Sequence, residues 1–352
     1  MMPIIRTTSL IRGRVNAVTN DVYASPTKQG RQNASDVVVV VNNNNKPTSP
    51  TTTSSVRTFR TLSSSLLSSS TPEDDDFLGN EANLFPPQQE YQAVFDIYHH
   101  HLHPDERDQL LTDPQMIVRF YRASKGHVTT TLQQLRLALQ WRREFQVEAL
   151  CRASPKDPLG RLLQRENATG KIYVRGYDAH GRALVYMRPA RENTHNEHDQ
   201  MRHLVYNLEK AIACTRRESG KRGKQLEKVI LLIDYEGWSL TNAPPMSTTK
   251  ATLHILQHMY PERMYRAFCL HPPLIFRAFW NMVRPFIDPV TKEKIVFVSS
   301  AKTQQLLWSL MNDPVNDLEM GAGGTLSPQD FDSAQYLQLP LDEAYPTTTK
   351  RK

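Results

Sequence analysis

The histidines of residues 99–103 are the densest group of side chains that could do chemistry in this chain. His99 and His103 are four residues apart, so in a helix they would share one face, a spacing that can bind zinc. The sequence gives them no third ligand at a fixed spacing and no obvious general base. We therefore expect a solvated helix end and no metal site, with a metal hydrolase as the alternative from the enzyme class.

Other catalytic signatures are missing from the sequence. It contains no G-x-S-x-G nucleophile turn, no Walker phosphate loop and no G-x-G-x-x-G after a strand. Asp234 ends an apolar strand, where an open sheet can place a catalytic or ribose-binding acid, but residues 235–238 form no phosphate cradle. We predict that the protein is not an enzyme, has no catalytic residue and needs no cofactor.

The charge of the chain is concentrated at its beginning. The formal net charge is +7, and residues 1–70 contain eight Lys or Arg and two Asp or Glu, so +6 belongs to this segment and +1 to the rest. The basic pI therefore does not indicate a nucleic-acid-binding domain, and we expect no nucleic-acid partner. The three cysteines, Cys151, Cys214 and Cys269, are far apart and predict buried reduced thiols.

Residues 1–80 are rich in Ser, Thr and Asn and predict a disordered basic tail. Their basic, hydroxyl-rich and acid-poor beginning also resembles an organelle transit peptide, so import through this segment stays open. The sequence has no run of 18 or more apolar residues and predicts no membrane span. We expect a cytoplasmic protein that associates peripherally with membranes.

The rest of the chain changes from helical to alternating patterns. Residues 88–150 show apolar positions at helical intervals and predict a helical module. From residue 171 onward, short strands alternate with helices, which predicts an α/β fold with a largely parallel sheet covered by helices. The strand predicted at 229–233 is continuously apolar, which indicates burial on both faces.

A helix predicted over residues 274–287 has an unusually bulky apolar stripe. Such a helix can pack on a sheet, cover a hydrophobic cavity or touch a membrane surface. Arg277 and Arg284 interrupt the apolar residues. The stripe consists of Ile275, Phe276, Phe279, Trp280, Val283 and Phe286.

Four blocks in order resemble the CRAL-TRIO lipid-binding family, which includes phosphatidylinositol-transfer proteins and carriers of tocopherol and retinaldehyde. The blocks are MIVRFYRASKGHVTTTLQQLRLALQWRREF (116–145), GYDAHGRALVYMRPARENT (176–194), KVILLIDYEGWSL (228–240) and YPERMYRAFCLHPPLIFRAFWNMVRPFIDPVTKEKIVFV (260–298). The resemblance covers roughly residues 90–312. It implies a CRAL-TRIO fold with a helical module at 88–150, a lipid-binding domain with a hydrophobic pocket at 151–312 and a C-terminal extension at 313–352. It also implies that helix 274–287 is a mobile gate over a buried lipid.

The resemblance carries a phosphoinositide headgroup site onto particular residues. The Glu of Y-P-E-R is Glu262, and the Thr and Lys of D-P-V-T-x-x-K are Thr291 and Lys294. An ammonium and a hydroxyl can both donate to a phosphate. The family's Arg in the helical module is replaced by Ser124, which removes a bidentate donor, and Lys125 is its candidate substitute.

We therefore expect a protein that binds a hydrophobic lipid, such as phosphatidylinositol, and exchanges it between membranes. Phosphatidylcholine is less favoured, because the strand at 229–233 has no hydroxyl group for its phosphate. The alternatives are a lipid-sensing adaptor that presents lipid to an enzyme and a carrier of a tocopherol-like molecule. The expected partners are the lipid and, transiently, a membrane surface, and the expected state is a monomer. The predicted lipid-lining residues of the sheet are Ile230, Leu232, Phe268 and Leu270.

Overall fold

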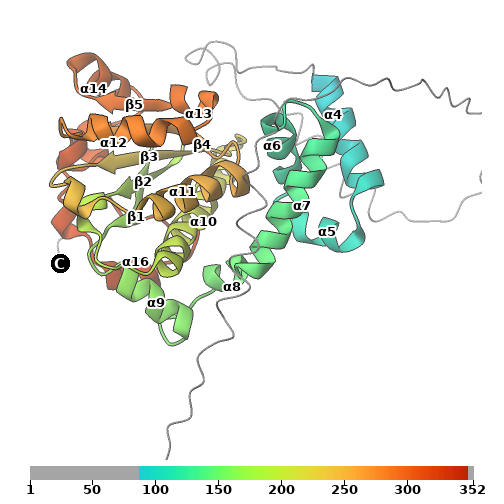
Figure 1. Ribbon diagram of the computed structural model, residues 1–352, viewed down its shortest axis with the longest axis horizontal. Coiled ribbons are helices and arrows are strands. Elements are labelled where there is room, and N and C mark those ends of the chain that lie inside the picture. Colours follow the sequence, from blue (N-terminus) through green and yellow to red (C-terminus); the bar gives the residue numbers. More distant parts are fainter. Residues whose placement is uncertain (1–86, 348–352) are drawn as a thin grey trace, which may run out of the picture. The chain divides into compact units, whose positions relative to one another are not determined.

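A five-stranded sheet is the centre of the fold (Figure 1). The structure is a computed structural model that describes residues 87–347, so the predicted tail at 1–80 lies outside the described residues. The strands are adjacent in chain order, β1 and β2 are antiparallel, and β2 to β5 are parallel. The predicted α/β class with a largely parallel sheet is thereby confirmed. The strands are β1 (Ile172–Tyr177), β2 (Ala183–Met187), β3 (Val229–Asp234), β4 (Met264–Leu270) and β5 (Ile295–Val298).

The turn between β1 and β2 is built around Asp178. Its Oδ1 accepts hydrogen bonds from the backbone N–H groups of His180, Gly181 and Arg182, at 3.0, 2.8 and 2.6 Å. Gly181 has φ +101°, a conformation that side chains other than hydrogen rarely permit. An aspartate with a glycine three residues later therefore closes the antiparallel pair at the edge of the sheet.

The N-terminal helices have a hydrophobic core of their own, separate from that of the sheet. Pro87–Asp96 continues into a π-helical turn at Ile97–His101, and α7 is longer than the helices before it. The helices of this module are α4 (Pro87–Asp96), α5 (Pro104–Leu110), α6 (Met116–Ala123) and α7 (Val128–Glu144). Two short helices, α8 (Val147–Cys151) and α9 (Pro158–Glu166), then lead into β1.

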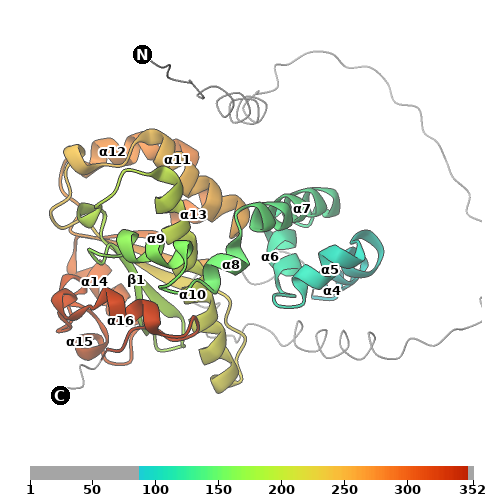
Figure 2. The same cartoon turned by 90° about the horizontal axis from the view of Figure 1, so that it is seen from below.

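Helices cover both faces of the sheet. Figure 2 shows α11 and α12 together on one side of the sheet and α14, α15 and α16 on the other. No helix within residues 87–347 has both the length and the apolar character that a membrane crossing requires. The helices after β2 are α10 (Glu197–Arg222), α11 (Met246–His254), α12 (Phe276–Val283), α13 (Pro289–Glu293), α14 (Ala301–Trp308), α15 (Pro314–Asp317) and α16 (Ser333–Gln338).

The helix predicted at 274–287 is shorter in the structure. α12 ends at Val283 and is followed by a 3₁₀ turn at Arg284–Phe286. Pro285 explains this end, because a proline has no backbone N–H for a helical hydrogen bond and clashes with the preceding turn. The chain then forms the short helix α13, which begins at Asp288 with the carboxylate Oδ1 accepting from the N–H of Thr291 at 2.9 Å.

The segment after α14 closes the sheet on the side opposite α12. Glu319 is fully buried and binds Arg175 at 3.0 Å, Arg188 and the hydroxyl of Tyr173 at 2.7 Å. Further along, the N–H of Tyr345 donates to the carbonyl of Val174 at 2.9 Å. The C-terminal segment therefore seals one face of the sheet through buried charge and backbone pairing.

Candidate functional site

The sheet face beneath α12 is set by the register of the parallel strands. One row across the sheet contains Val185, Leu231, Ala267 and Ile295, and the next row on this face contains Met187, Ile233, Cys269 and Phe297. Residues two apart on a strand share a face, so both rows point to the same side. Every one of these side chains is apolar, which gives this face the character of an acyl-chain surface.

A small cavity of about 10 Å³, close to the space that one water molecule needs, lies on this face. Its lining comes from residues of β1, β2 and β3, from residues of α10, and from Leu256 in the π-helical turn at Ile255–Met259. The one polar side chain there, Asn207, already donates to the carbonyl of His203 at 2.9 Å and accepts from Tyr336 at 2.7 Å. The lining residues are Ile172, Val185, Met187, Leu204, Asn207, Leu208, Leu231 and Leu256.

The inner face of α12 packs on the same side through aromatic contacts. The ring centroid of Phe297 is 6.0 Å from that of Phe276 and 5.2 Å from that of Trp280. Trp238, in the loop after β3, lies 5.6 Å from Phe276 and 5.4 Å from Phe279. Val283 is buried, while Phe279 and Trp280 are half-buried. Through these contacts, the inner face of α12 lies over the carboxyl ends of β3 and β5.

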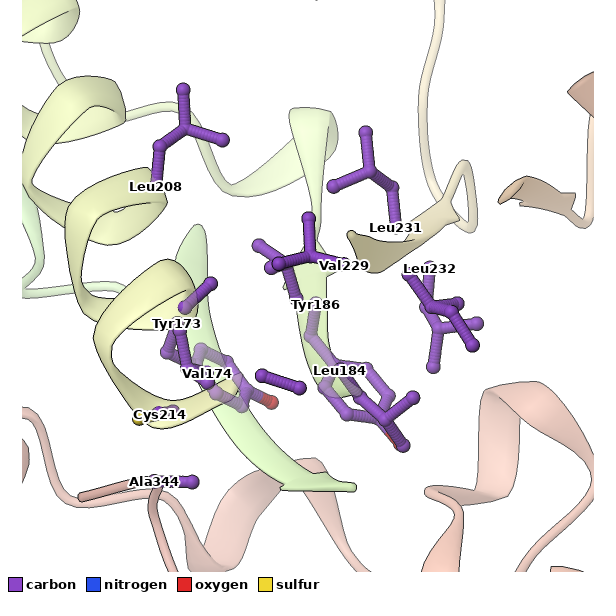
Figure 3. Close-up of a cluster of buried hydrophobic side chains, with 14 of the residues drawn as sticks. Tyr173, Val174, Leu184, Tyr186, Leu208, Cys214, Val229, Leu231, Leu232 and Ala344 are labelled. Carbon is purple, nitrogen blue, oxygen red and sulfur yellow. The ribbon is translucent and has the colours of Figure 1, made fainter. Parts of the chain in front are cut away.

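The prediction that Ile230, Leu232, Phe268 and Leu270 line a pocket under α12 is wrong. These residues alternate with Leu231, Ile233, Ala267 and Cys269, so they point to the opposite face. Figure 3 shows Leu231 and Leu232 on opposite sides of their strand. All four are at most 2% exposed, and the C-terminal segment covers their side of the sheet.

Large apolar side chains are exposed on α12 and on the residues that flank it, beside the polar Asn281. Leu274 is 85% exposed, Met282 52% and Phe286 43%, although each is a large hydrophobic residue. Ile275 is also half exposed. The predicted stripe is therefore divided: Phe276, Phe279, Trp280 and Val283 face the sheet, whereas Ile275 and Phe286 face outward.

The C-terminal end of α12 is attached to the neighbouring helix by one amide. The Nε2 of Gln257 donates to the carbonyl of Phe286 at 2.9 Å, and its Oε1 accepts from the N–H of Asp288 at 2.9 Å. Both backbone groups belong to the turn where the chain leaves the helix. Gln257 thus fixes this end of α12 to the π-helical turn that follows α11.

Two of the four predicted headgroup side chains, Glu262 and Lys294, come together. Lys294 is buried, and its Nζ lies 3.4 Å from the Oε2 of Glu262. Lys228 approaches the same oxygen at 3.7 Å. Glu262 has φ +57°, a conformation that L-residues other than Asn and Asp seldom adopt. Thr291 lies in α13, three residues before Lys294, and its backbone N–H is bound to Asp288.

Ser124 and Lys125, at the helical-module position of the predicted site, form no hydrogen bond or ion pair with Glu262 or Lys294 in the described residues. Ser124 is buried, and its Oγ has no hydrogen-bond partner within residues 87–347. Lys125 is exposed with φ +51°, and in this described part no hydrogen bond or ion pair joins it to Glu262 or Lys294. The structure therefore does not bring Lys125 to the other headgroup residues, and its role as a substitute stays a prediction.

A buried ion-pair cluster, which the sequence did not reveal, links the helical module to β4. Asp113 contacts Arg119 at 2.5 Å, Arg263 at 2.7 Å and Arg216 at 2.8 Å, and Glu227 contacts both Arg119 and Arg263. Burial alone would raise the pKa of Asp113, but the three guanidinium groups hold that pKa well below its usual range. Burial, together with the nearby Arg119, lowers the pKa of Arg263 to about 10.

The acid at the end of β3 lies beside a histidine and a second acid. Asp234 is buried and its Oδ1 contacts the Nδ1 of His271 at 3.0 Å, with Glu236 close by. In the described residues this is the one group of three side chains that could share a metal ion, so His99 and His103 form no such group. The ring of His99 instead lies 4.3 Å from that of Phe95, while His103 begins α5.

Comparison with known proteins connects this geometry to a family. Residues 167–313 match the model of the CRAL/TRIO domain. A CRAL-TRIO domain-containing protein of Schizosaccharomyces pombe is 36% identical over 54% of this chain and 18% of that protein. The phosphatidylinositol transfer protein PDR17 of Saccharomyces cerevisiae is 32% identical over 52% of this chain and 51% of that protein. The chain thus spans about half or less of these relatives.

Other matches are more distant. The SEC14 cytosolic factor of Candida glabrata is 24% identical over 64% of this chain and 75% of that protein. The crystal structure of Sfh5 aligns with a TM-score of 0.47 and 19% identity, over 66% of this chain and 78% of that chain. The resemblance to the CRAL-TRIO family is therefore confirmed through the family model and the sequence relatives.

Proposed function

We propose that this chain, which carries a CRAL/TRIO domain at residues 167–313, binds one lipid between α12 and the sheet and exchanges it between membranes. The observation that carries the proposal is the two-sided character of α12. Its inner side chains rest on an apolar sheet face, while Met282 on its outer side and Leu274, Ile275 and Phe286 at its ends are large, apolar and exposed. A helix of this kind can leave the sheet for a membrane interface without exposing more apolar surface to water.

Movement of α12 is needed for loading. Pockets for drug-sized ligands occupy roughly 300–1,000 Å³, whereas the cavity here has a volume of about 10 Å³. A phospholipid with two acyl chains is larger than such ligands, so the site must widen. Displacement of α12 would uncover the apolar sheet face next to this cavity, and burial of acyl chains there, at about 0.8 kcal/mol per methylene, would supply the driving force.

Phosphatidylinositol is the proposed ligand. Lys294 and Lys228 converge on Glu262, and an ammonium group released from that carboxylate could bind a phosphate. Thr291 would add a hydroxyl donor from α13. Two of the matched relatives are named phosphatidylinositol transfer proteins, which supports the same ligand class.

A neutral, tocopherol-like ligand is the second candidate. Ser124 stands where the family has an arginine, and a hydroxyl group cannot replace a bidentate guanidinium at a phosphate. The absence of hydroxyl residues on β3 also suits a neutral hydrophobe. The choice between these ligands depends on whether Lys294 contacts the bound molecule.

In this proposal the protein makes and breaks no covalent bond and needs no cofactor beyond the bound lipid. It acts as a cytoplasmic monomer that touches membranes transiently, and import into an organelle through residues 1–80 is the alternative destination. The lipid-sensing adaptor differs in that it would hold its lipid rather than exchange it.

A vesicle transfer assay tests the function. Donor vesicles would contain fluorescent phosphatidylinositol, phosphatidylcholine or tocopherol, and the rate of appearance in acceptor vesicles would be measured with the full chain. The proposal predicts catalysed transfer of phosphatidylinositol above the other two. Transfer of tocopherol alone would support the second candidate, and stable binding without transfer would support the adaptor.

A further inference from the structure

Two segments beside the lipid site contain no acidic residue. Residues 246–259 (α11 and the following π-helical turn) and residues 274–287 (α12 and the following 3₁₀ turn) lack Asp and Glu, although the chain has 36 of them among 352 residues. The first segment contains Lys250, His254 and His258, and the second contains Arg277 and Arg284. We call the exposed side chains of these two segments the acid-free surface.

Contacts at their ends hold the two segments side by side. The Nζ of Lys250 lies 4.7 Å from the ring centroid of Phe286, which is a cation–π distance. The amide of Gln257 binds the carbonyl of Phe286 and the N–H of Asp288. Figure 2 shows α11 next to α12. The basic side chains of α11 therefore border the exposed apolar side chains of α12.

The basic residues of α11 form a stripe at four-residue spacing. Lys250, His254 and His258 are all exposed, and the rings of the two histidines are stacked with centroids 4.7 Å apart. The Nδ1 of His258 lies 3.2 Å from the carbonyl of His254. Two imidazoles and one ammonium group thus share a line beside Phe286.

The carboxylates of the neighbouring elements have hydrogen-bond or ion-pair partners other than the two histidines. On α10, Glu197 accepts from Thr248 at 2.9 Å and Asp199 pairs with Arg165 at 3.0 Å. Glu209 of α10 pairs with Arg142 of α7 at 2.6 Å. The other charged or titratable groups named near the stripe are His198 and Arg202 on α10, Arg284 after α12, and Asp288, whose N–H binds Gln257 and whose Oδ1 accepts from the N–H of Thr291.

In the described part of the chain, the two histidines of the stripe contact each other and have no acidic partner. Within residues 87–347 no ion pair joins a carboxylate to either ring, and partial burial together with the neighbouring His258 lowers the pKa of His254. The stripe carries the positive charge of Lys250, and imidazole is the side chain whose ordinary pKa lies nearest to neutral pH.

We propose that the acid-free surface is a proton-sensitive contact for anionic membrane, which strengthens as the pH falls and both histidines become charged. The inference rests on the proposed lipid-exchange function. Anionic lipid is the occupant that the charge favours, because apolar residues enter the interface while Lys250, His254 and His258 face the headgroups. Binding and protonation are linked, so an anionic surface would also favour the protonated form of His254.

Flotation of the full chain with vesicles tests this directly. Vesicles of phosphatidylcholine alone, or with phosphatidylserine, would be compared at about pH 7.5 and about pH 5.5, which bracket the ordinary pKa of histidine. On phosphatidylserine vesicles the affinity should rise about fivefold for each imidazole that becomes charged, since one basic group near an anionic leaflet contributes about 1 kcal/mol. Vesicles of phosphatidylcholine alone should show no such rise.

Three variants separate this explanation from others. The double variant His254→Gln with His258→Gln should lose the rise at low pH and bind as the parent does at high pH. Lys250→Ala should weaken binding at both pH values and keep the rise. His100→Gln with His101→Gln, an exposed pair in the helical module, should behave as the parent.

The inference is overturned if the rise persists in the His254 and His258 double variant, if it occurs equally on neutral vesicles, or if the parent shows none. Bound lipid would be extracted from the same preparations. Protein that carries lipid but shows no rise would remove this inference and leave the proposed function, whereas protein without lipid or vesicle binding would remove both.

Discussion

Leu232 and Ile233 are neighbours in the chain but belong to different sides of the sheet. Ile233 is half-buried on the side of α12, while Leu232 is completely buried on the side of the C-terminal segment. A larger side chain at position 233 would fill the proposed lipid space, whereas a change at position 232 would disturb only the core. The two positions therefore offer a direct test of which face binds lipid.

We expect Ile233→Trp to abolish most lipid binding with little effect on the midpoint of urea unfolding. Leu232→Ala should keep lipid binding and lower the free energy of unfolding by about 2–5 kcal/mol, the usual cost of removing a buried leucine side chain. Lipid would be quantified by mass spectrometry of extracts from the folded protein. Normal lipid content in Ile233→Trp would place the ligand elsewhere.

Lys294 separates headgroup recognition from acyl-chain burial. Lys294→Ala should reduce transfer of phosphatidylinositol about 10- to 100-fold, because a hydrogen bond to a charged group contributes about 1.5–3 kcal/mol. Transfer of a neutral hydrophobe should be unchanged, since its binding depends on the apolar face alone. The matched control is Lys292→Ala, two residues earlier in α13.

Equal losses for both ligands in Lys294→Ala would mean that the side chain supports the fold and does not bind the headgroup. The comparison of the two ligands is needed because Lys294 also pairs with Glu262. When Lys294 is removed, Lys228 is the only other cation shown at this carboxylate in the described chain.

The sequence indicated the residue types of the site better than their orientation. The run 229–233 is apolar at every position, so strand alternation offered no polar residue to mark the outer face. Which face binds lipid depends on the pairing of Leu231 with Val185 and Ala267 and on the side taken by α12. These are relations between distant residues, and local pattern does not contain them.

At the scale of elements, α12 is held differently at its two ends. Its beginning is packed through rings, with the centroid of Phe276 4.3 Å from that of Tyr235 and 5.6 Å from that of Trp238. Its end is held by the two hydrogen bonds of Gln257. Aromatic packing can be exchanged for membrane contact, whereas the backbone hydrogen bonds need their specific partner. We therefore expect α12 to open about the end that Gln257 holds.

Gln257→Ala should loosen this end and accelerate lipid exchange several-fold, because two hydrogen bonds of about 1 kcal/mol each are lost. The exchange rate would be followed by stopped-flow transfer between vesicles. Gln304→Ala is the control, since the Nε2 of Gln304 donates to the carbonyl of Ala322 at 2.9 Å away from α12. A faster rate in both variants, or in neither, would contradict a hinge at Gln257.

The extent of α12 was partly predictable. Its inner stripe at positions 276, 279, 280 and 283 follows from helical spacing, and Pro285 indicates where the regular helix must end. Gln257 carried no comparable signal, because it lies 29 residues from Phe286 and an amide on a helix is common.

At the scale of the whole molecule, the C-terminal segment packs against Lys210 of α10. Lys210 is fully buried in α10, and its Nζ donates to the carbonyl of Pro340 at 2.7 Å and lies 5.0 Å from the ring centroid of Tyr336. Burial lowers the pKa of Lys210 from 10.5 to about 8. The C-terminal segment thus covers a lysine for which charge is unfavourable.

This pKa predicts a pH dependence of stability. The unfolded chain holds the proton of Lys210 up to pH 10.5, while the native protein releases it above about pH 8. Stability contributed by this group therefore rises with pH between these values and is absent below them. The free energy of unfolding of the parent, relative to Lys210→Met, should increase as the pH is raised through that window.

Urea unfolding at several pH values, read by circular dichroism, measures this difference. Lys224→Met removes an exposed lysine and should leave the pH dependence of the parent unchanged. A parent and a Lys210→Met variant with parallel pH profiles would show that Lys210 titrates normally and that the segment after α15 does not bury it.

The order of helices and strands after residue 171 could be predicted from alternating patterns, and so could the helical module before it. The role of the C-terminal segment could not. Glu319 lies 144 residues from Arg175, and Asp113 lies 150 residues from Arg263, so the buried ion pairs that join the molecule have no local signature. Individual charged residues in the sequence mostly indicate exposed positions.

The most direct test of the account is native mass spectrometry of the full chain, purified without detergent, followed by extraction of what it holds. We expect one phospholipid per protein, with phosphatidylinositol as the main species in the parent, loss of most lipid in Ile233→Trp and loss of phosphatidylinositol in Lys294→Ala. A parent protein that carries no lipid and takes up none from added vesicles would contradict it.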